Sequence, residues 1–369
     1  MRMSHLSSTD LTRREALARG LCLLSAGVVA GAALPDIASA QPPAFPRGAV
    51  IRTLFKDYAP EEFAGGATVF HEHTQLGTDF GDKFRAATNA VRALNGLPPQ
   101  PPPTPPSGPP PPDPRRDPKL MAEELNAARR DGIACLVDAG HPDMGRDIAF
   151  TRQAAMLSGL PVVAGAGFYS QPYYPKEIST MSEDEIVRAL VQQVDEFPAG
   201  VFGEIGSWDE MTRDERKVFR AIGKAHVATN LSILTHTGIP GKAAIEQLDI
   251  LEDAGVNPNR VVIGHLGNLI DPHVYVHKTI CRRGAFVGFD RQGGPNDAAD
   301  VPLVMALVDG GFADNLLFSA DQSTGFGRTL TAFVPKLKAA GLNDAVLHKI
   351  MVDNPRRFLA CVPKRPRKR

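Results

Sequence analysis

His71 and His73 stand one residue apart at the end of a short apolar run, Thr68-Val69-Phe70. In a β-strand, residues two positions apart point to the same face, so both imidazoles could bind one metal ion. The pair alone is a weak signal because buried structural histidines are common. Glu72, between them, would point to the opposite face and is expected to be structural.

Four more ligand-type residues follow apolar runs later in the chain: Glu204, His236, His265 and Asp321. Four imidazoles and two carboxylates suit two divalent transition metal ions, Zn²⁺ above all, with Mn²⁺ or Co²⁺ as alternatives. Such ions lower the pKa of bound water and so provide a nucleophile at neutral pH. Each residue alone could be a polar group at a strand end, but six at successive strand ends indicate a metal site.

Apolar runs without alternation predict strands buried on both faces, as in a parallel sheet. Eight such runs occur, at 67–70, 133–138, 161–164, 201–204, 232–235, 261–264, 285–289 and 316–319. Helical patterns lie between most of them, at 119–130, 148–157, 183–196, 213–228, 242–254 and 301–308. This alternation predicts an α/β fold, a (β/α)₈ TIM barrel with the metal site at its carboxyl-terminal rim. A doubly wound open sheet is the alternative, but its ligands would cluster at one switch point.

Several segments together resemble the amidohydrolase superfamily and, within it, the phosphotriesterase family. They are TVFHEH (68–73), VD (137–138), GRD (145–147), AGAGFY (164–169), GEIGS (203–207), LTHTG (234–238), IGH (263–265), VGFDR (287–291) and FSAD (318–321). The resemblance covers about residues 50–360. Glu204 stands where the best-known members carry a carboxylated lysine, although other members of this branch have Glu there.

The resemblance implies a role for each ligand. His71, His73 and Asp321 would hold the more buried metal ion, and His236 and His265 the more exposed one. Glu204 and a hydroxide would bridge the two ions. Asp321 would also be the catalytic residue, because it would touch both metal and hydroxide and could accept the proton.

Four residues near the rim are candidates for binding substrate: Tyr169, Trp208, Asp290 and Arg291. Tyr169 follows the third strand, and Trp208, the only tryptophan, lies just past Glu204. Simple aromatic packing is the alternative for both rings. Asp290 and Arg291 end the seventh strand and could relay a proton or hold substrate, whereas a plain surface ion pair is the alternative.

The N-terminus has the three parts of a twin-arginine signal peptide. Arg13-Arg14 precedes the apolar stretch 21–34, and Ala38-Ser39-Ala40 offers a small-residue cleavage site. The apolar stretch is short and weakly hydrophobic, so it predicts export and not stable membrane insertion. We therefore expect residues 1–40 to be removed, the twin-arginine export machinery to be a partner, and the mature protein to be periplasmic or secreted.

Composition bounds the rest of the chain. Its 369 residues are 43% hydrophobic with a formal net charge of zero, so a full core can form and no nucleic-acid surface is indicated. We expect a hydrolase domain at 41–360 and a solvated basic tail at 361–369.

A proline-dominated segment, 98–118, is predicted between the first strand and its helix. It would be an exposed insertion or, as the sharper alternative, a polyproline II ligand for a partner.

Three functions compete. The first is a metal-dependent hydrolase of a lactone, carboxylic ester or phosphoester, acting on a small-molecule ester substrate. The second is a TatD-like nuclease, whose His-x-His and Gly-Glu-Ile-Gly runs are similar, and the third is a non-catalytic exported metal-binding protein. The natural substrate and the oligomeric state, for which a homodimer is one option, stay open.

Overall fold

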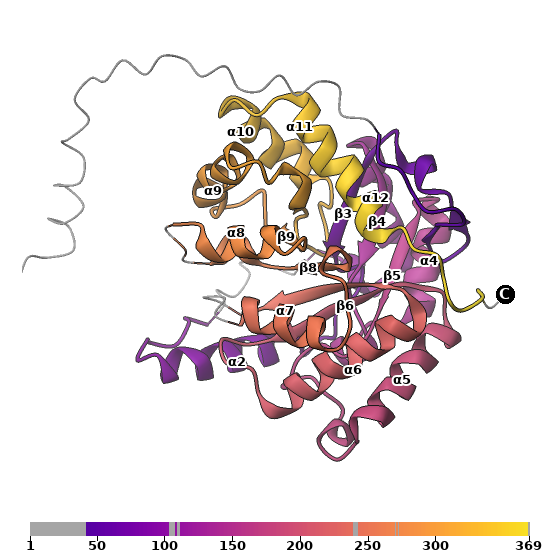
Figure 1. The fold of residues 1–369 in the computed structure, drawn as a ribbon, viewed down its shortest axis with the longest axis vertical. Coiled ribbons are helices and arrows are strands. Elements are labelled where there is room, and N and C mark those ends of the chain that lie inside the picture. Colours follow the sequence, from indigo (N-terminus) through magenta and orange to yellow (C-terminus); the bar gives the residue numbers. More distant parts are fainter. Residues whose placement is uncertain are drawn as a thin grey trace, which may run out of the picture. The chain divides into compact units, whose positions relative to one another are not determined.

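The computed structural model describes residues 42–102, 108, 111–238, 243–269, 271 and 273–367, all within one compact unit. Eight parallel strands lie in sequence order in one sheet (Figure 1). They are β3 (Ala67–Glu72), β4 (Ile133–Asp138), β5 (Val162–Ala166), β6 (Ala199–Ser207), β7 (Ser232–Thr237), β8 (Val261–Ile263), β9 (Phe286–Phe289) and β10 (Leu316–Phe318). Each coincides with one of the eight predicted runs.

The first and last strands meet and nearly close the sheet into a barrel. The backbone N–H of Asp321 donates to the carbonyl of His71 at 3.2 Å, and the N–H of His73 donates to that of Gln322 at 2.9 Å. An open doubly wound sheet has no such seam, because its edge strands stay apart. The predicted (β/α)₈ TIM barrel is therefore confirmed, and three candidate ligands lie at the seam itself.

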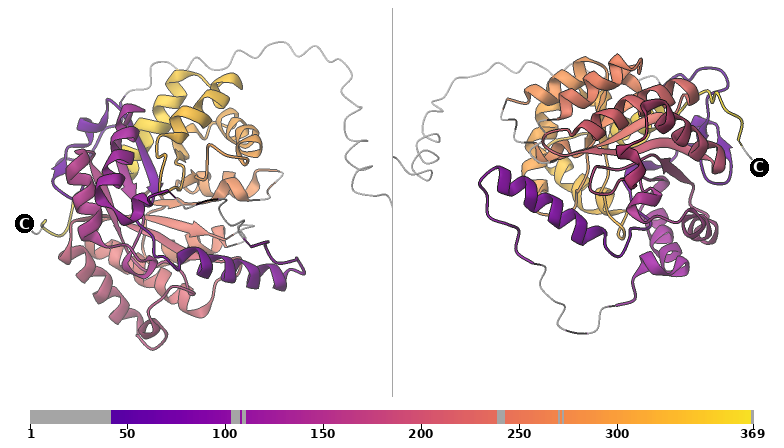
Figure 2. Two further views of the ribbon diagram at one scale, coloured as in Figure 1. Left: turned by 180° about the vertical axis from the view of Figure 1, so that it is seen from behind. Right: turned by 90° about the horizontal axis from the view of Figure 1, so that it is seen from below.

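Helices follow the strands and cover the outside of the barrel (Figures 1 and 2). The expected ones are α3 (Pro118–Arg130), α4 (Ile148–Ser158), α5 (Glu183–Glu196), α6 (Arg213–Thr229), α7 (Ala244–Asp253) and α9 (Asp297–Asp309). Five further helices were not named from the sequence: α2 (Phe80–Leu94), α8 (Tyr275–Arg282), α10 (Val334–Ala339), α11 (Asp344–His348) and α12 (Asn354–Leu359). Capping boxes fix the starts of α5 and α6, where Ser182 pairs with Glu185 and Thr212 with Glu215.

The core has two layers separated by the strands. Alternate strand residues such as Phe70, Val201 and Leu317 fill the barrel interior, while their neighbours, such as Val69 and Leu316, pack outward against the helices. Because both faces are buried, the strand sequences show no polar alternation.

The proline-rich segment lies between the first strand and α3, as predicted, but an unpredicted helix, α2, comes between β3 and that segment. Helix α2 has no buried residue and extends past the barrel to one side (Figure 2). Its apolar residues, Phe80, Phe84 and Val91 among them, recur at helical spacing, but none of them is fully buried. Of the proline-rich segment, residues 103–107 and 109–110 lie outside the described residues.

The basic tail contacts the barrel up to Arg367 and is not simply solvated. The backbone of Cys361 forms an isolated antiparallel β-bridge with that of Val50. Val50 lies next to the short antiparallel pair β1 (Ile51–Arg52) and β2 (Asp57–Tyr58). Arg367 Nη1 donates to Asp57 Oδ1 at 3.0 Å, beneath the barrel. The predicted signal peptide lies outside the described residues. Within the described part, no helix combines the length and apolar character needed to cross a membrane.

Candidate metal centre

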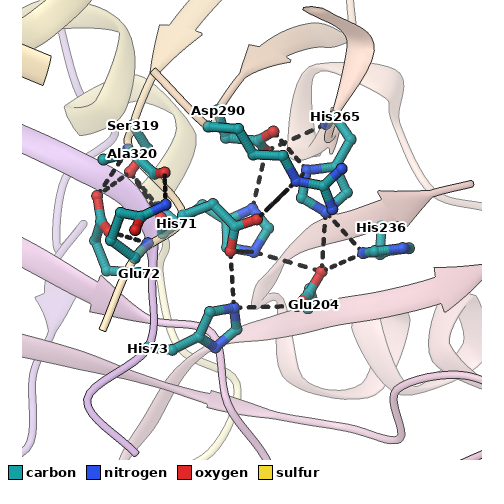
Figure 3. A network of polar contacts seen from close by, with 12 residues as sticks. His71, Glu72, His73, Glu204, His236, His265, Asp290, Ser319 and Ala320 are labelled. Carbon is teal, nitrogen blue, oxygen red and sulfur yellow. Dashed lines mark hydrogen bonds and ion pairs between the residues drawn. The ribbon is translucent and has the colours of Figure 1, made fainter. Parts of the chain in front are cut away.

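Glu204, in the second half of β6, lies among the four predicted histidine ligands (Figure 3). Its Oε1 is 3.2 Å from Nε2 of His73, and its Oε2 is 2.8 Å from Nδ1 of His236. Nε2 of His71 and Nε2 of His265 each lie 3.4 Å from the same Oε2. One buried carboxylate thus touches all four imidazoles.

The donor atoms form overlapping groups, each compact enough to hold an ion. Within each group all atoms lie within 4.8 Å of one another: His71, His73 and Glu204; His71, His265 and Asp321; Glu204, His236 and His265. Asp321 also approaches His73, with Oδ1 3.1 Å from Nε2. The structure therefore brings together every predicted ligand, and Glu204 belongs to two groups that differ in their histidines.

Local backbone conformation aims these side chains. His265, Arg291 and Asp321 follow β8, β9 and β10 with positive φ values of 62°, 68° and 52°. Such conformations are costly for non-glycine residues and persist where the surroundings impose them, often at functional sites. Gly203 allows the strands beside Glu204 to approach, because a Cβ there would lie 2.6 Å from the carbonyl oxygen of Leu234.

The charges of the cluster compensate one another. Burial would raise the pKa of Glu204, but His71 and His236 hold it well below its usual value. Burial would lower the pKa of His73, yet Asp321 and Glu204 raise it to about 9. Burial and the neighbouring His265 lower the pKa of His236 to about 4. The charge of His71 and the hydrogen bond to His73 likewise hold the pKa of Asp321 well below its usual value. Both carboxylates are thus ionised, and the raised pKa values of His71 and His73 place the compensating positive charge on these two rings.

These residues fit a divalent metal ion. Nε2 of His71 is buried and has no hydrogen-bond partner in the described part of the chain, although it faces the carboxylates of Glu204 and Asp321. A buried ring nitrogen without a hydrogen-bond partner is costly, and a bound metal ion would supply the missing partner. Metal ions would replace the protons on the histidines and supply the positive charge that the buried carboxylates require.

Asp290 lies behind the histidines and not among the cavity-lining residues. Its Oδ2 is 3.0 Å from Nδ1 of His71, and its Oδ1 contacts Nδ1 of His265. A carboxylate at Nδ1 fixes the tautomer that leaves Nε2 free for a metal. The position of Asp290 thus favours support of two ligands over direct substrate contact.

Glu72 stabilises the contact between β3 and the loop after β10, as expected of a structural residue. Its carboxylate accepts hydrogen bonds from the hydroxyl of Ser319 at 2.8 Å and from the backbone N–H groups of Ala320 at 2.9 Å and Gln322 at 2.8 Å. These bonds hold the loop that carries Asp321 against the strand that carries His71 and His73.

A cavity of about 240 Å³ opens above the ligands. It is lined by His73, Leu76, Phe80, Phe84, Tyr169, Glu204, His236, His265, Arg291, Asp321 and Ser323. Tyr169 and Arg291 therefore line the cavity, and their role in binding substrate stays a prediction. Tyr169 Oη lies 3.0 Å from Nδ1 of His236, and Arg291 Nε donates to Asp321 Oδ2 at 3.1 Å.

Trp208 lines a neighbouring cavity, 5.4 Å from the ring of Phe84. The sequence analysis missed Phe80 and Phe84, because it did not recognise α2. The signal was present, since two aromatic residues four positions apart follow Asp79, a residue type common before helices.

The chain matches known hydrolases over most of its length. The sequence model of the phosphotriesterase family matches residues 64–359. An aryldialkylphosphatase from Saccharolobus solfataricus is 29% identical over 266 residues, which are 64% of this chain and 84% of that protein. An N-acetyltaurine hydrolase from Dictyostelium discoideum is 27% identical over 273 residues, 66% of this chain and 74% of that protein.

A solved structure has the same fold. The phosphotriesterase homology protein from Escherichia coli, crystallised with phosphate in its active site, superposes with a TM-score of 0.68 at 25% identity. The match covers 80% of this chain and 99% of that protein.

Proposed function

This chain belongs to the phosphotriesterase family, and we propose that it hydrolyses a lactone, carboxylic ester or phosphoester with two divalent metal ions, of which zinc suits the ligands best. More broadly, it is a hydrolase of ester or amide-like bonds, in keeping with the names of its relatives. The observation that carries the proposal is Glu204, a buried carboxylate that two different pairs of histidines share at the floor of a cavity.

The proposal assigns the ligands to two sites. His71, His73 and Asp321 would hold one ion, His236 and His265 the other, and Glu204 would contact both. When bound, such ions supply an ionised water at neutral pH and polarise the carbonyl or phosphoryl oxygen under attack.

Asp321 and two further side chains, Arg291 and Tyr169, have roles that need only their present geometry. Asp321 is 14% exposed in its side chain and reaches the cavity, so one of its carboxylate oxygens can accept the proton of the attacking water. Arg291 holds that carboxylate at 3.1 Å and keeps it ionised and oriented. Tyr169, whose pKa burial and Glu204 raise well above its usual value, stays protonated and can donate a hydrogen bond to substrate.

A hydrolysis screen tests this function. The mature protein, reconstituted with zinc or manganese, is assayed on lactones, aryl esters, phosphotriesters and N-acyl amides beside a Glu204→Ala control. Turnover that the control lacks is the expected result. If no substrate is turned over faster by the wild type than by the control, the chain is a metal-binding protein without hydrolase activity. Metal-dependent digestion of DNA alone would instead favour the TatD-like nuclease.

We also propose that the protein works after export to the periplasm or beyond. The support is the paired arginines, apolar stretch and small-residue cleavage site in residues 1–40. A site that binds metal before export suits this route, because the twin-arginine machinery passes folded proteins.

A further inference from the structure

A second cavity, of about 340 Å³, adjoins the metal cavity on the side of α2. The two share Phe84, His236 and Arg291 as lining residues. The second is lined in addition by Thr88, Val91, Arg92, Asn95, Leu97, Gln100, Trp208, Asp209 and Gly238. A molecule at the predicted ligands can therefore extend into it.

Apolar side chains from α2 and from the loop after β6 form much of the wall of this second cavity, which we call the α2 pocket. Phe84 lies between Trp208, at 5.4 Å between ring centroids, and His236, at 6.3 Å. Val91 and Leu97 continue the apolar wall away from the metal cavity. Cavities of this size and character are typical of sites for small apolar ligands.

Two of the polar side chains on the α2 side bond to backbone carbonyls, whereas Thr88 Oγ1 and, on the facing wall, Trp208 Nε1 are buried with no hydrogen-bond partner among the described residues. Arg92 Nε donates to the carbonyl of Pro98 at 2.6 Å, and Asn95 Nδ2 donates to that of Val91 at 2.9 Å. The N–H of Leu97 donates to the carbonyl of Arg92 at 2.8 Å. These bonds fold the chain back onto α2 and hold Leu97 at the pocket.

Helix α2 is fixed at one end only. Phe80 packs 4.9 Å from the ring of Tyr173, whose hydroxyl donates to the carbonyl of Phe80 at 3.0 Å. Toward the other end, Val91 is only half-buried, and Leu97, just past the helix, is 51% exposed. A ligand in the pocket would therefore cover apolar surface of both residues.

We propose that the α2 pocket binds an uncharged, apolar chain of the substrate while the scissile ester group lies at the predicted metal ligands. The proposal rests on the proposed function for the position of the ester, but the pocket is defined by Phe84, Val91, Leu97 and Trp208 without it. Helix α2 would then select substrates by chain length. The α2 residues that line the metal cavity, Phe80 and Phe84, can neither bind a metal ion nor carry a proton, so the helix would be a specificity element and not part of the chemistry.

A binding experiment needs neither metal nor turnover. Trp208 is the only tryptophan of the 369 residues, so its fluorescence reports the pocket directly. Titration of the mature protein with 1-octanol should change the emission at a concentration on the order of a hundredfold lower than with 1-butanol, because four more methylenes are buried. Equal half-saturation by both alcohols, or no response to either, would overturn the proposal.

Two sets of variants test whether the alcohols bind in the α2 pocket or elsewhere on the protein surface. The double variant Val91→Asn/Leu97→Asn should lose most of the octanol preference. Leu94→Asn, on the same helix but pointing to solvent, should keep it. If both variants lose the octanol preference, or both keep it, the alcohol binds at another surface of the protein. If the double variant does not fold, as judged by circular dichroism, Val91→Ala/Leu97→Ala replaces it.

A chain-length series links the pocket to turnover. With p-nitrophenyl esters from acetate to octanoate, kcat/KM of the metal-loaded wild type should rise by up to about fourfold per methylene. In the double variant the octanoate-to-acetate ratio should collapse, and in Leu94→Asn it should not. A flat series in an active wild type refutes the pocket alone. No hydrolysis of any ester refutes the proposed function, while the Trp208 titration still tests the pocket.

Discussion

The Oδ2 atom of Asp290 lies 3.0 Å from Nδ1 of His71, on the side of the ring away from Glu204. Because the other oxygen contacts His265, one carboxylate orients a candidate ligand of each metal ion. Replacing such a supporting group typically weakens metal binding by about 10- to 100-fold. We therefore expect Asp290→Asn to lower metal affinity within this range, measured by competition with a chelator.

Asp300→Asn is the matched control for this experiment. Asp300 is a buried aspartate whose two oxygens have no hydrogen-bond partner among the described residues. The same exchange there should leave metal affinity unchanged. Wild-type affinity in Asp290→Asn, or equal losses in both variants, would show that Asp290 does not act through the histidines.

The raised pKa of Asp300 predicts how the free energy of unfolding depends on pH. Burial, with Asp290 and Asp297 nearby, raises its pKa from 3.8 to about 7. A carboxyl group with a raised folded-state pKa favours folding when protonated, so its contribution is full below about pH 4 and is lost as the pH rises through 7. Asn stays neutral, and Asp300→Asn should gain stability relative to wild type over this window, by at most about 1.4 kcal/mol per pH unit.

Urea unfolding of both proteins at pH 5 and pH 8 measures this difference. The comparison cancels the loss of metal at low pH, which affects both proteins alike. A stability difference that is the same at the two pH values would mean that Asp300 is not held neutral in the folded protein.

The number of metal ions bound per chain tests whether two ions share Glu204 as a ligand. Elemental analysis of the reconstituted mature protein should approach two equivalents, because two sets of histidines meet at this carboxylate. Glu204→Ala should hold fewer, since no other described carboxylate lies between His73 and His236. A wild-type value that stays at or below one equivalent after reconstitution with zinc or manganese would refute the two-metal proposal.

The strands and the predicted ligands could be located from the sequence because both depend on short-range patterns. An apolar run that ends in His236 or His265 identifies a buried parallel strand and its carboxyl end together, and the barrel then gathers those ends. Helix α2 follows no such rule. Its apolar residues, such as Phe84 and Val91, recur at helical spacing but face a cavity and not the core, so the helix is an addition to the barrel pattern.

The role of Asp290 also lay beyond sequence reasoning. Asp290 and Arg291 are adjacent in sequence, yet Asp290 contacts the backs of the histidines while Arg291 lines the cavity. The positive φ of 68° at Arg291 turns the chain between them. Only the fold reveals which of two neighbouring polar residues faces the site.

Export is predicted to depend on the arginine pair. Arg13→Lys with Arg14→Lys keeps the positive charge but removes the guanidinium groups of the twin-arginine signal, so the precursor should remain in the cytoplasm. Cell fractionation with immunoblotting measures this, with Arg2→Lys as a control outside the pair. Unchanged periplasmic accumulation of the double variant would contradict the proposed location.

The last prediction concerns the proton. Burial would raise the pKa of Asp321, but the charge of His71 and the hydrogen bond to His73 hold it well below its usual value. Asp321 is therefore ionised at neutral pH and can accept a proton from the attacking water. In the wild type, kcat/KM should rise with pH and level off once that water is ionised, with a midpoint at or below about 7. The midpoint belongs to the coupled cluster and not to Asp321 alone.

Asp321→Asn keeps the shape of the side chain and can still offer a neutral oxygen, so the fold should survive. The rate should fall by ~10²-fold or more, the loss typical of removing general acid–base help, and further if metal is lost. The measurement is a pH–rate profile of both proteins, each checked for metal content, so that loss of a ligand is separated from loss of a base. A fully metallated Asp321→Asn with near wild-type rates would show that the proton goes elsewhere. Asp290 could not simply replace it, because its oxygens face the Nδ1 atoms of His71 and His265.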